Sequence, residues 1–230
     1  MAPAHTAVVL VSGGLDSCVA AAVAAPEREL AFLHASYGQR TCTRELASFE
    51  SIAEHYGVRR RLVADLQYLG QIGGSSLVDQ TLPLPDHGDA DAAMPSTYVP
   101  FRNANLLSVA VAWAEAIGAA EVYVGAHHAD SPYPDCSEVF FSAFNRLVEA
   151  GTGPDSHIAI LTPLLKLDKA GIVRLGVELE APLQLTWSCY RSDDEPCRRC
   201  HSCELRRLGF EGAGVEDPLQ LGAHNTEERR

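Results

Sequence analysis

The stretch Ala7-Val8-Val9-Leu10-Val11-Ser12-Gly13-Gly14-Leu15-Asp16-Ser17 decides the fold of this chain. Its apolar, β-branched beginning predicts a buried parallel strand, and the alanine-rich run Cys18 to Ala25 predicts a helix that ends before Pro26. Glycines between a strand and a helix let the backbone approach an anion, which the N–H groups at the helix start then bind. The sequence therefore predicts a phosphate-binding turn at residues 12–17.

Asp16 is the unusual member of this turn, because a carboxylate repels phosphate unless a cation such as Mg²⁺ lies between them. The turn lacks both the lysine of the GxxxxGK[ST] loop and the spacing of GxGxxG. It resembles the SGGxDS loop of the ATP pyrophosphatases, which split ATP between its α and β phosphates and adenylate a substrate. The alternative is a glycine turn without a ligand. The residues that we expect to bind ATP here are Val11, Ser12, Gly13, Gly14, Leu15, Asp16 and Ser17.

Length and composition fit one globular α/β core with a small appendage, since the chain has 230 residues, 47% of them hydrophobic and 21% charged. A formal net charge of −12 argues against broad contact with nucleic acid, which needs lysine and arginine. No apolar run approaches the ~20 residues of a membrane span, and residues 1–6 have no signal-peptide character. We expect a cytoplasmic protein with no nucleic-acid or membrane partner.

Apolar runs alternate with helical segments along the chain. Strands are predicted over 7–11, 30–35, 60–66, 121–124 and 158–161, and helices over 18–25, 40–56, 102–117, 137–150 and 169–179. This order predicts an α/β fold with a doubly wound, mainly parallel five-stranded sheet. We assign residues 1–186 to the α/β domain and residues 187–230 to a C-terminal region packed on the same domain.

The turn after the second predicted strand carries polar residues at the edge where open parallel sheets bind ligands. Tyr37 and Gln39 are placed to face an adenine or its ribose, and Arg40 to reach a phosphate. A glycine turn with a solvated arginine is the alternative. A longer segment, residues 70–97, is rich in Gly, Pro, Ser and Asp, and a loop of this length inside a domain is often a lid. We predict that it closes over the site when substrates bind.

Two cations begin predicted helices, where the helix dipole disfavours positive charge. Arg102, followed by Asn103, and Lys169, preceded by the predicted N-cap Asp168, are therefore expected to face bound anions, with a solvated side chain as the alternative. Asp135 precedes the 137–150 helix, where it either accepts two N–H bonds from a guanine-like edge or caps that helix. His127 and His128 are neighbours that point apart, so loop contacts or exposure are favoured over a metal site.

Four of the seven cysteines cluster near the C-terminus: Cys189, Cys197, Cys200 and Cys203. The last three have the spacing C-x-x-C-x-x-C, which lets thiolates converge on one tetrahedral Zn²⁺, with a helix over 200–208. Four thiolates leave no open position for water, so the site is expected to be structural; an iron–sulfur cluster is the alternative. The remaining cysteines are expected to be packing residues, and an odd count rules out complete internal disulfide pairing.

These motifs together resemble the 7-cyano-7-deazaguanine synthases, the QueC family of queuosine precursor biosynthesis. The matching segments, in family order over nearly the whole chain, are residues 12–17, 37–40, 95–100 with 102–103, 133–136, 162–164 with 169, and 188–190 with the three later cysteines. The resemblance implies the adenine nucleotide alpha hydrolase-like fold and a homodimer. Phe101 stands where the family usually has a small residue, which keeps open an enzyme that attaches a deazaguanine to a protein partner.

The resemblance also implies a reaction. ATP adenylates 7-carboxy-7-deazaguanine, ammonia displaces AMP to give the amide, and a second ATP activates the amide for dehydration to the nitrile. In this interpretation Ser12, Gly13, Gly14 and Ser17 hold phosphate, Asp16 holds Mg²⁺, and Lys169 with Arg102 neutralises pyrophosphate. The implied substrate-binding residues are Arg102, Asn103, Tyr133 and Asp135.

Three alternatives remain open from the sequence. The first is a related enzyme that stops at the amide or conjugates the deazaguanine to a protein. The second is another ATP pyrophosphatase, acting on tRNA or on a different acid, against which the acidic composition speaks. The third is a zinc-stabilised nucleotide-binding module without catalysis.

Overall fold

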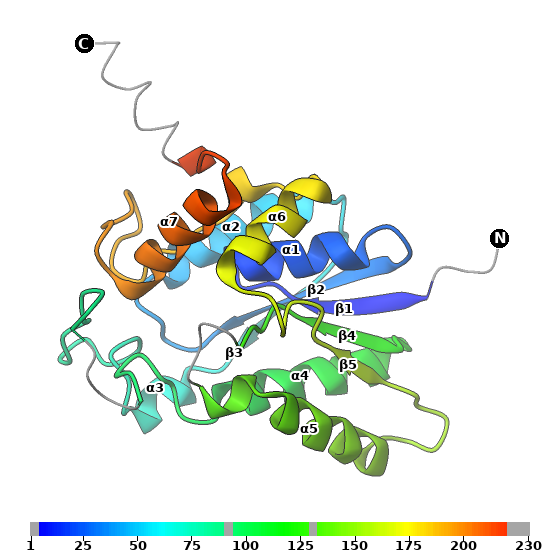
Figure 1. Ribbon diagram of the computed structural model, residues 1–230. Coiled ribbons are helices and arrows are strands. Elements are labelled where there is room, and N and C mark those ends of the chain that lie inside the picture. The colour runs from blue at the N-terminus through cyan, green and yellow to red at the C-terminus, as the bar shows by residue number, and fades with distance from the viewer. Residues whose placement is uncertain (1–4, 90–93, 129–132, 220–230) are drawn as a thin grey trace.

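One parallel sheet organises the molecule. In the computed structural model, which describes residues 5–89, 94–128 and 133–219, the strand order is β3-β2-β1-β4-β5 and every neighbouring pair is parallel (Figure 1). The strands are β1 (Thr6–Leu10), β2 (Glu29–Ser36), β3 (Arg60–Asp65), β4 (Glu121–Val124) and β5 (Ala159–Leu161). The predicted fold class, a doubly wound parallel five-stranded sheet, is confirmed.

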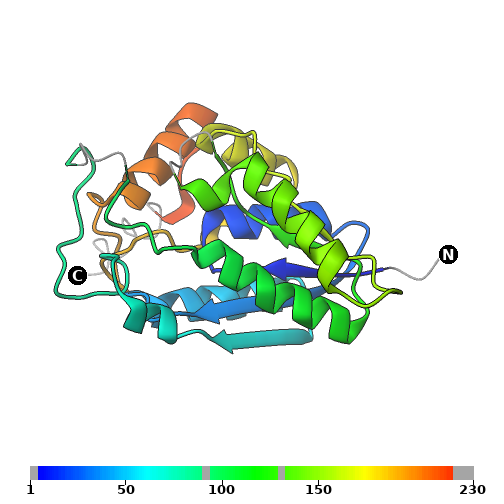
Figure 2. The same ribbon diagram turned by 90° about the horizontal axis from the view of Figure 1, so that it is seen from below.

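Helices cover both faces of the sheet, as Figures 1 and 2 show from two directions. One face carries α1 (Leu15–Ala24), α2 (Cys42–His55), α6 (Lys169–Glu178) and α7 (His201–Ala213), and the other carries α4 (Arg102–Ile117) and α5 (Glu138–Gly151). The short elements are α3 (Tyr68–Ile72), η1 (Pro134–Cys136) and η2 (Leu183–Leu185). The predicted helices are present with ends shifted by a few residues, and α7 runs five residues beyond the predicted end at residue 208.

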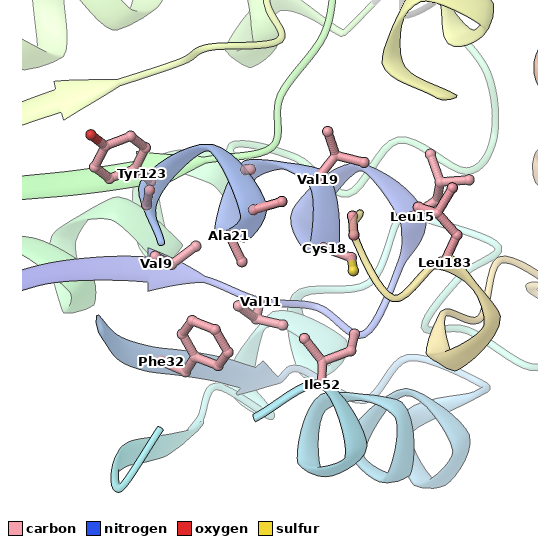
Figure 3. Close-up of a cluster of buried hydrophobic side chains, with 14 of the residues drawn as sticks. Val9, Val11, Leu15, Cys18, Val19, Ala21, Phe32, Ile52, Tyr123 and Leu183 are labelled. Atoms are coloured by element: carbon pink, nitrogen blue, oxygen red, sulfur yellow. The ribbon is translucent and has the colours of Figure 1, made fainter. Parts of the chain in front are cut away.

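The two faces of β1 feed two hydrophobic cores. Val9 and Val11 pack with α1, α2 and Phe32 in one core, which Figure 3 shows, whereas Val8 and Leu10 belong to the core beneath α4 and α5. A strand buried on both faces reads as a continuous apolar run, which is why this segment was recognisable. Cys18 is fully buried in the first core, and burial raises the pKa of its thiol to about 12, as suits a packing residue.

The irregular segment after α3 is tied to the rest of the molecule. Arg40 donates to the carbonyl oxygens of Ser76, Asp79 and Leu82 at 2.6–2.8 Å. Further along, Asp86 accepts a hydrogen bond from Arg191 at 2.9 Å and pairs with Cys200 in an isolated β-bridge. The described part of this segment is thus anchored at two places. Residues 90–93 lie outside the described ranges, and closure of the segment over the site stays a prediction. Among the described helices none is both long and apolar enough to cross a membrane.

Candidate active site

A pocket of about 270 Å³ opens at the carboxyl end of β1. β1 has β2 on one side and β4 on the other, and this reversal of strand order is where open α/β sheets hold ligands. The wall comprises the 12–17 turn, the ends of β2 and β4, the starts of α4 and α6, and part of the cysteine-rich region. Segments far apart in the sequence therefore meet at one place.

The 12–17 turn is shaped by its own hydrogen bonds. The Ser17 hydroxyl donates to the Gly14 carbonyl at 2.9 Å, and the Ser12 backbone N–H donates to the Ser17 hydroxyl oxygen at 3.1 Å. Gly13 has φ of +87°, and a Cβ there would lie 2.3 Å from the Glu45 carbonyl oxygen, so only glycine fits. All seven predicted ATP-binding residues of this stretch except Gly13 line the pocket.

Asp16 and Lys169 meet at the pocket although 153 positions separate them in sequence. The Lys169 Nζ lies 2.7 and 2.8 Å from the two Asp16 carboxylate oxygens and 3.3 Å from His127 Nε2. Asp168 caps α6 by accepting from the Gly171 N–H, as predicted, and this places Lys169 at the helix start. Sequence analysis favoured loop contacts or exposure for His127, but its ring lines the pocket 3.4 Å from Asp16.

Arg102 faces the pocket from the start of α4 inside a tyrosine shell. Its Nη1 donates to the Tyr37 hydroxyl at 3.1 Å, and its guanidinium lies 5.5 Å from the Tyr37 ring centroid. Tyr133 and Tyr190 also line the pocket. Burial raises the pKa of each of these three phenols, so they are neutral hydroxyl donors at physiological pH. The buried Arg102 Nε has no hydrogen-bond partner within the described ranges, which suits a site for an anion.

Gln39 and Arg40 are the predicted ATP-binding residues that the structure turns away from the pocket. Gln39 accepts from the Tyr37 N–H at 2.8 Å and donates to Glu45 at 3.1 Å. The Arg40 guanidinium donates hydrogen bonds to backbone carbonyls of the 76–82 segment. Direct contact of these two side chains with ATP is therefore not supported, because both are committed to holding the chain in place.

Asp135 also does something other than predicted. Its Oδ2 accepts from the Asn103 N–H at 2.9 Å, so it stabilises the start of α4, while Ser137 caps α5 by accepting from the Phe140 N–H. The predicted capping of the 137–150 helix by Asp135 is therefore wrong. Asp135 is 4% exposed and does not line the pocket, whereas Asn103 and Tyr133 do. The guanine-edge contact predicted for Asp135 has no geometric support.

The four predicted metal-ligating cysteines converge. The sulfur atoms of Cys189, Cys197, Cys200 and Cys203 all lie within 4.8 Å of one another, and none is in a disulfide. Hydrogen bonds from Cys200 and Cys203, together with N–H groups of the surrounding loop, hold the pKa of Cys189 well below its usual range. Four sulfurs at this spacing fit a tetrahedral metal ion with no open position.

The cysteine-rich region contributes pocket residues that sequence analysis missed. Ser188, Tyr190 and Ser202, each adjacent in sequence to a cluster cysteine or between two, line the pocket together with Arg206 of α7. The Trp187 N–H donates to the Gly13 carbonyl at 2.9 Å and so joins this region to the 12–17 turn. Glu45 of α2 was missed too; its position one turn into the helix after the 37–40 turn was the available signal.

The parallel α/β sheet has a glycine turn at its switch point and an Asp–Lys pair beside that turn, which defines a nucleotide-binding α/β protein. The four-cysteine cluster in the pocket wall is able to hold a metal ion. The model of the family described as queuosine biosynthesis protein QueC matches residues 6–214. The chain belongs to this QueC family, which confirms the resemblance seen in the sequence.

Relatives are similar over almost their whole length. The 7-cyano-7-deazaguanine synthase of Chlorobium chlorochromatii is 50% identical over 215 residues, 93% of this chain and 94% of that protein. The protein of the same name from Chlorobium phaeovibrioides is 52% identical over 215 residues, 93% of this chain and 95% of that one. Among solved structures, NAD+ synthetase from Burkholderia pseudomallei covers 99% of this chain and 82% of its own with a TM-score of 0.47 and 16% identity, a likeness that carries no functional conclusion.

Proposed function

We propose that this protein uses ATP and ammonia to convert 7-carboxy-7-deazaguanine to 7-cyano-7-deazaguanine. The observation that carries the proposal is the pocket in which the 12–17 turn, the Asp16–Lys169 pair and Arg102 with its tyrosines meet. The names of relatives about 50% identical over nearly their full length support the same reaction. The alternatives of another acid or a tRNA, and of a non-catalytic module, have no comparable support.

The chemistry needs activation because a carboxylate resists attack by ammonia until one of its oxygens becomes a good leaving group. The substrate carboxylate attacks the α-phosphorus of ATP, pyrophosphate departs, and ammonia then displaces AMP from the acyl carbon to give the amide. In the second round the amide oxygen attacks the α-phosphorus of another ATP and pyrophosphate departs; loss of AMP, which takes the amide oxygen with it, and of both amide N–H protons then leaves the nitrile. Positioning and charge stabilisation are the protein's main contributions.

Each pocket residue has a proposed task in this scheme. The 12–17 turn holds the β and γ phosphates on its N–H groups and hydroxyls. Lys169 balances the charge of the departing pyrophosphate, and Asn103 and Tyr133 contact the acid substrate. Arg102 lies on the tyrosine side of the pocket and neutralises the anion there. Asp16, a carboxylate still 23% exposed toward the pocket, fits Mg²⁺, which when bound would screen the phosphate charge.

The cysteine cluster is proposed to hold Zn²⁺ as a structural ion, with an iron–sulfur cluster as the alternative. The four converging sulfurs and the N–H groups directed at Cys189 support a closed thiolate site. Elemental analysis of the purified protein tests this: about one zinc per chain without iron or acid-labile sulfide is expected from four-thiolate coordination. Iron with sulfide in place of zinc would overturn it.

A cytoplasmic homodimer is proposed as the state of the enzyme. Val139 and Leu147 lie two turns apart on α5 with most of their side-chain surface exposed. These exposed apolar side chains support a dimer contact on α5. Light scattering at micromolar concentration tests this, and a mass of one chain would contradict it.

The product assay decides the main proposal. Incubation with 7-carboxy-7-deazaguanine, ATP and ammonium should give the nitrile by mass spectrometry, with AMP released in both rounds. Lys169→Met should slow AMP release strongly, while Lys166→Met, a change at an exposed lysine three residues earlier, should not. Amide as the final product, a protein-linked deazaguanine, or absence of AMP would each contradict the proposal and identify one of the alternatives.

A further inference from the structure

Glu45 is a pocket carboxylate to which the scheme above gives no task. Asp16 is the other carboxylate among the described residues that line the pocket, and both of its oxygens face Lys169. Glu45 instead has neutral partners: Thr41 Oγ1 donates to its Oε1 at 2.8 Å, and Gln39 Nε2 donates to its Oε2 at 3.1 Å. Within the described ranges it forms no ion pair, so its negative charge is available to a ligand.

A chain of hydrogen bonds fixes this carboxylate relative to Arg102. Arg102 donates to the Tyr37 hydroxyl, the Tyr37 N–H donates to Gln39 Oε1, and Gln39 Nε2 donates to Glu45. Gln39 is only 5% exposed and also donates to the Ala35 carbonyl, which locks its amide in place. The frame therefore has a cation at one end, an anion at the other and the Tyr37 ring between them.

The Glu45 oxygens retain acceptor capacity. An ionised carboxylate has about four lone-pair sites on two oxygens. Each Glu45 oxygen accepts one hydrogen bond from a described residue, so the two oxygens can each accept one more, from two donors that lie side by side. Burial raises the pKa of this carboxyl, and the desolvated group gains more from a ligand that brings N–H donors than from solvent.

We infer that Glu45 is the specificity-determining group that binds the donor edge of the acid substrate, meaning the adjacent ring N–H and exocyclic amino group of a guanine-like heterocycle. This inference rests on the proposed function. The edge offers two neighbouring donors, one for each carboxylate oxygen, whereas the Watson–Crick edge of adenine offers one donor beside an acceptor and matches a carboxylate poorly. Glu45 thus takes the task that sequence analysis gave to Asp135.

The other end of the frame suits the rest of such a substrate. A 7-carboxy-7-deazaguanine is flat and aromatic and carries an anion at the opposite side from its donor edge. Tyr37, Tyr133 and Tyr190 supply flat walls, and Arg102 supplies positive charge on the same side of the pocket. Complementary charges at both ends fix the direction in which the heterocycle enters.

The test compares Glu45→Gln with the control Glu54→Gln, a change at an exposed position of the same helix. Both variants and the wild type are assayed by AMP release with 7-carboxy-7-deazaguanine and with its analogue lacking the exocyclic amino group. Loss of a charge-assisted pair of hydrogen bonds should lower kcat/KM for the amino-bearing acid by about 10–100-fold in Glu45→Gln, mostly through KM. The KM for ATP and for ammonium should stay unchanged, and the preference over the analogue should disappear.

Other results overturn the inference. An increase in the KM for ATP or for ammonium alone would place Glu45 in a different subsite, and an unchanged preference for the amino-bearing acid would remove it from recognition. If Glu45→Gln does not fold, Glu45→Asp, which keeps the charge but withdraws it from the pocket, should show the same loss of preference. Wild-type protein that forms no AMP with either acid would overturn the proposed function itself, a failure that differs from equal behaviour of wild type and variant.

Discussion

The 12–17 turn and the 37–40 turn are two similar pieces of sequence with opposite uses. Each follows a buried parallel strand at the same edge of the sheet, and each contains a glycine with positive φ, +87° at Gly13 and +84° at Gly38. In the first turn, six of the seven predicted residues line the pocket. In the second, only Tyr37 does, while Gln39 and Arg40 bond to neighbouring chain segments.

The end of a parallel strand therefore predicts where a ligand binds, but it does not predict which side chains point toward that ligand. The 12–17 turn bonds mainly within itself, and six of its seven predicted residues still line the pocket. In the 37–40 turn, by contrast, Gln39 donates to the Ala35 carbonyl of β2 and to the Glu45 carboxylate of α2, and Arg40 donates to carbonyls of the 76–82 segment. Substitutions in the 12–17 turn should therefore affect catalysis, whereas substitutions in the 37–40 turn should affect stability.

The largest effect is expected at Asp16. Asp16→Asn keeps the shape but removes the charge that faces Lys169 and would hold Mg²⁺, so AMP formation should fall by about 10²–10³-fold, as for loss of one preorganised charge-stabilising group. The thermal midpoint should change little, since the side chain is partly exposed. Initial-rate assays at saturating ATP and a melting curve measure the two. Activity close to wild type would remove the 12–17 turn from catalysis.

The two glycines give the next effect, because their dihedral angles match and their surroundings differ. Gly13→Ala adds a Cβ 2.3 Å from the Glu45 carbonyl oxygen, so left-handed strain and overlap together should cost about 2–5 kcal/mol of unfolding free energy. Gly38→Ala adds a Cβ whose nearest neighbour is 3.8 Å away, so only the strain of about 1–2 kcal/mol is expected. Urea unfolding of both variants checks the difference, and equal costs would contradict the close approach of α2 to the turn.

Much of the fold could be predicted because its signals are local. β1, β4 and the centre of β2 are short apolar runs buried on both faces, and α4 ends at Gly118 in the left-handed conformation, as its sequence position indicated. The convergence of the four cysteines was equally readable, since their spacing predicted that the sulfurs lie close together. The pairing of Asp16 with Lys169 was not predicted: the position of a lysine at a helix start indicated an anionic partner, but the expected partner was a bound phosphate.

The pocket residues that sequence analysis missed are placed by tertiary packing, which the spacing of residues in the sequence does not reveal. Glu45 reaches the pocket because α2 packs directly against Gly13. Arg206 reaches it because α7 packs on α6 and because the buried Asp217 holds the Arg206 guanidinium. Asp135 was misjudged for the same reason: the helix that it stabilises is α4, which begins 33 residues earlier in the sequence, at Arg102. Such choices among nearby partners are made by the tertiary fold.

Arg40 should give a smaller effect, on stability and not on nucleotide binding. Arg40→Met removes the donors to the carbonyls of the 76–82 segment, and loss of charge-assisted hydrogen bonds should cost about 1.5–3 kcal/mol. The KM for ATP should stay unchanged, and thermolysin should cleave faster within this segment. Arg59→Met, at an exposed position, is the control and should change neither quantity. A raised KM for ATP without faster cleavage by thermolysin would indicate that Arg40 contacts ATP, as sequence analysis predicted.

The smallest effect concerns His34, which joins the strands that lead into the two turns. Its ring lies among Phe49 and other core residues, and its Nδ1 is 3.1 Å from the Val11 carbonyl oxygen, to which it donates in the neutral tautomer. Burial lowers the pKa of His34, so below the usual histidine pKa of about 6.5 the unfolded chain binds a proton that the folded protein does not.

The free energy of unfolding should therefore fall as pH drops below about 6.5, by at most ~1.4 kcal/mol per pH unit from this group, until the lowered pKa of folded His34 is reached. Urea unfolding of the wild type and of His34→Gln at a series of pH values between about 7.5 and 5.5 measures the contribution as a difference in slope. His55→Gln, at an exposed histidine on α2, should retain the wild-type slope. Parallel curves for the wild type and His34→Gln would mean that the ring takes up its proton without leaving Val11, and the bond between the two strands would then be insensitive to the charge of the histidine.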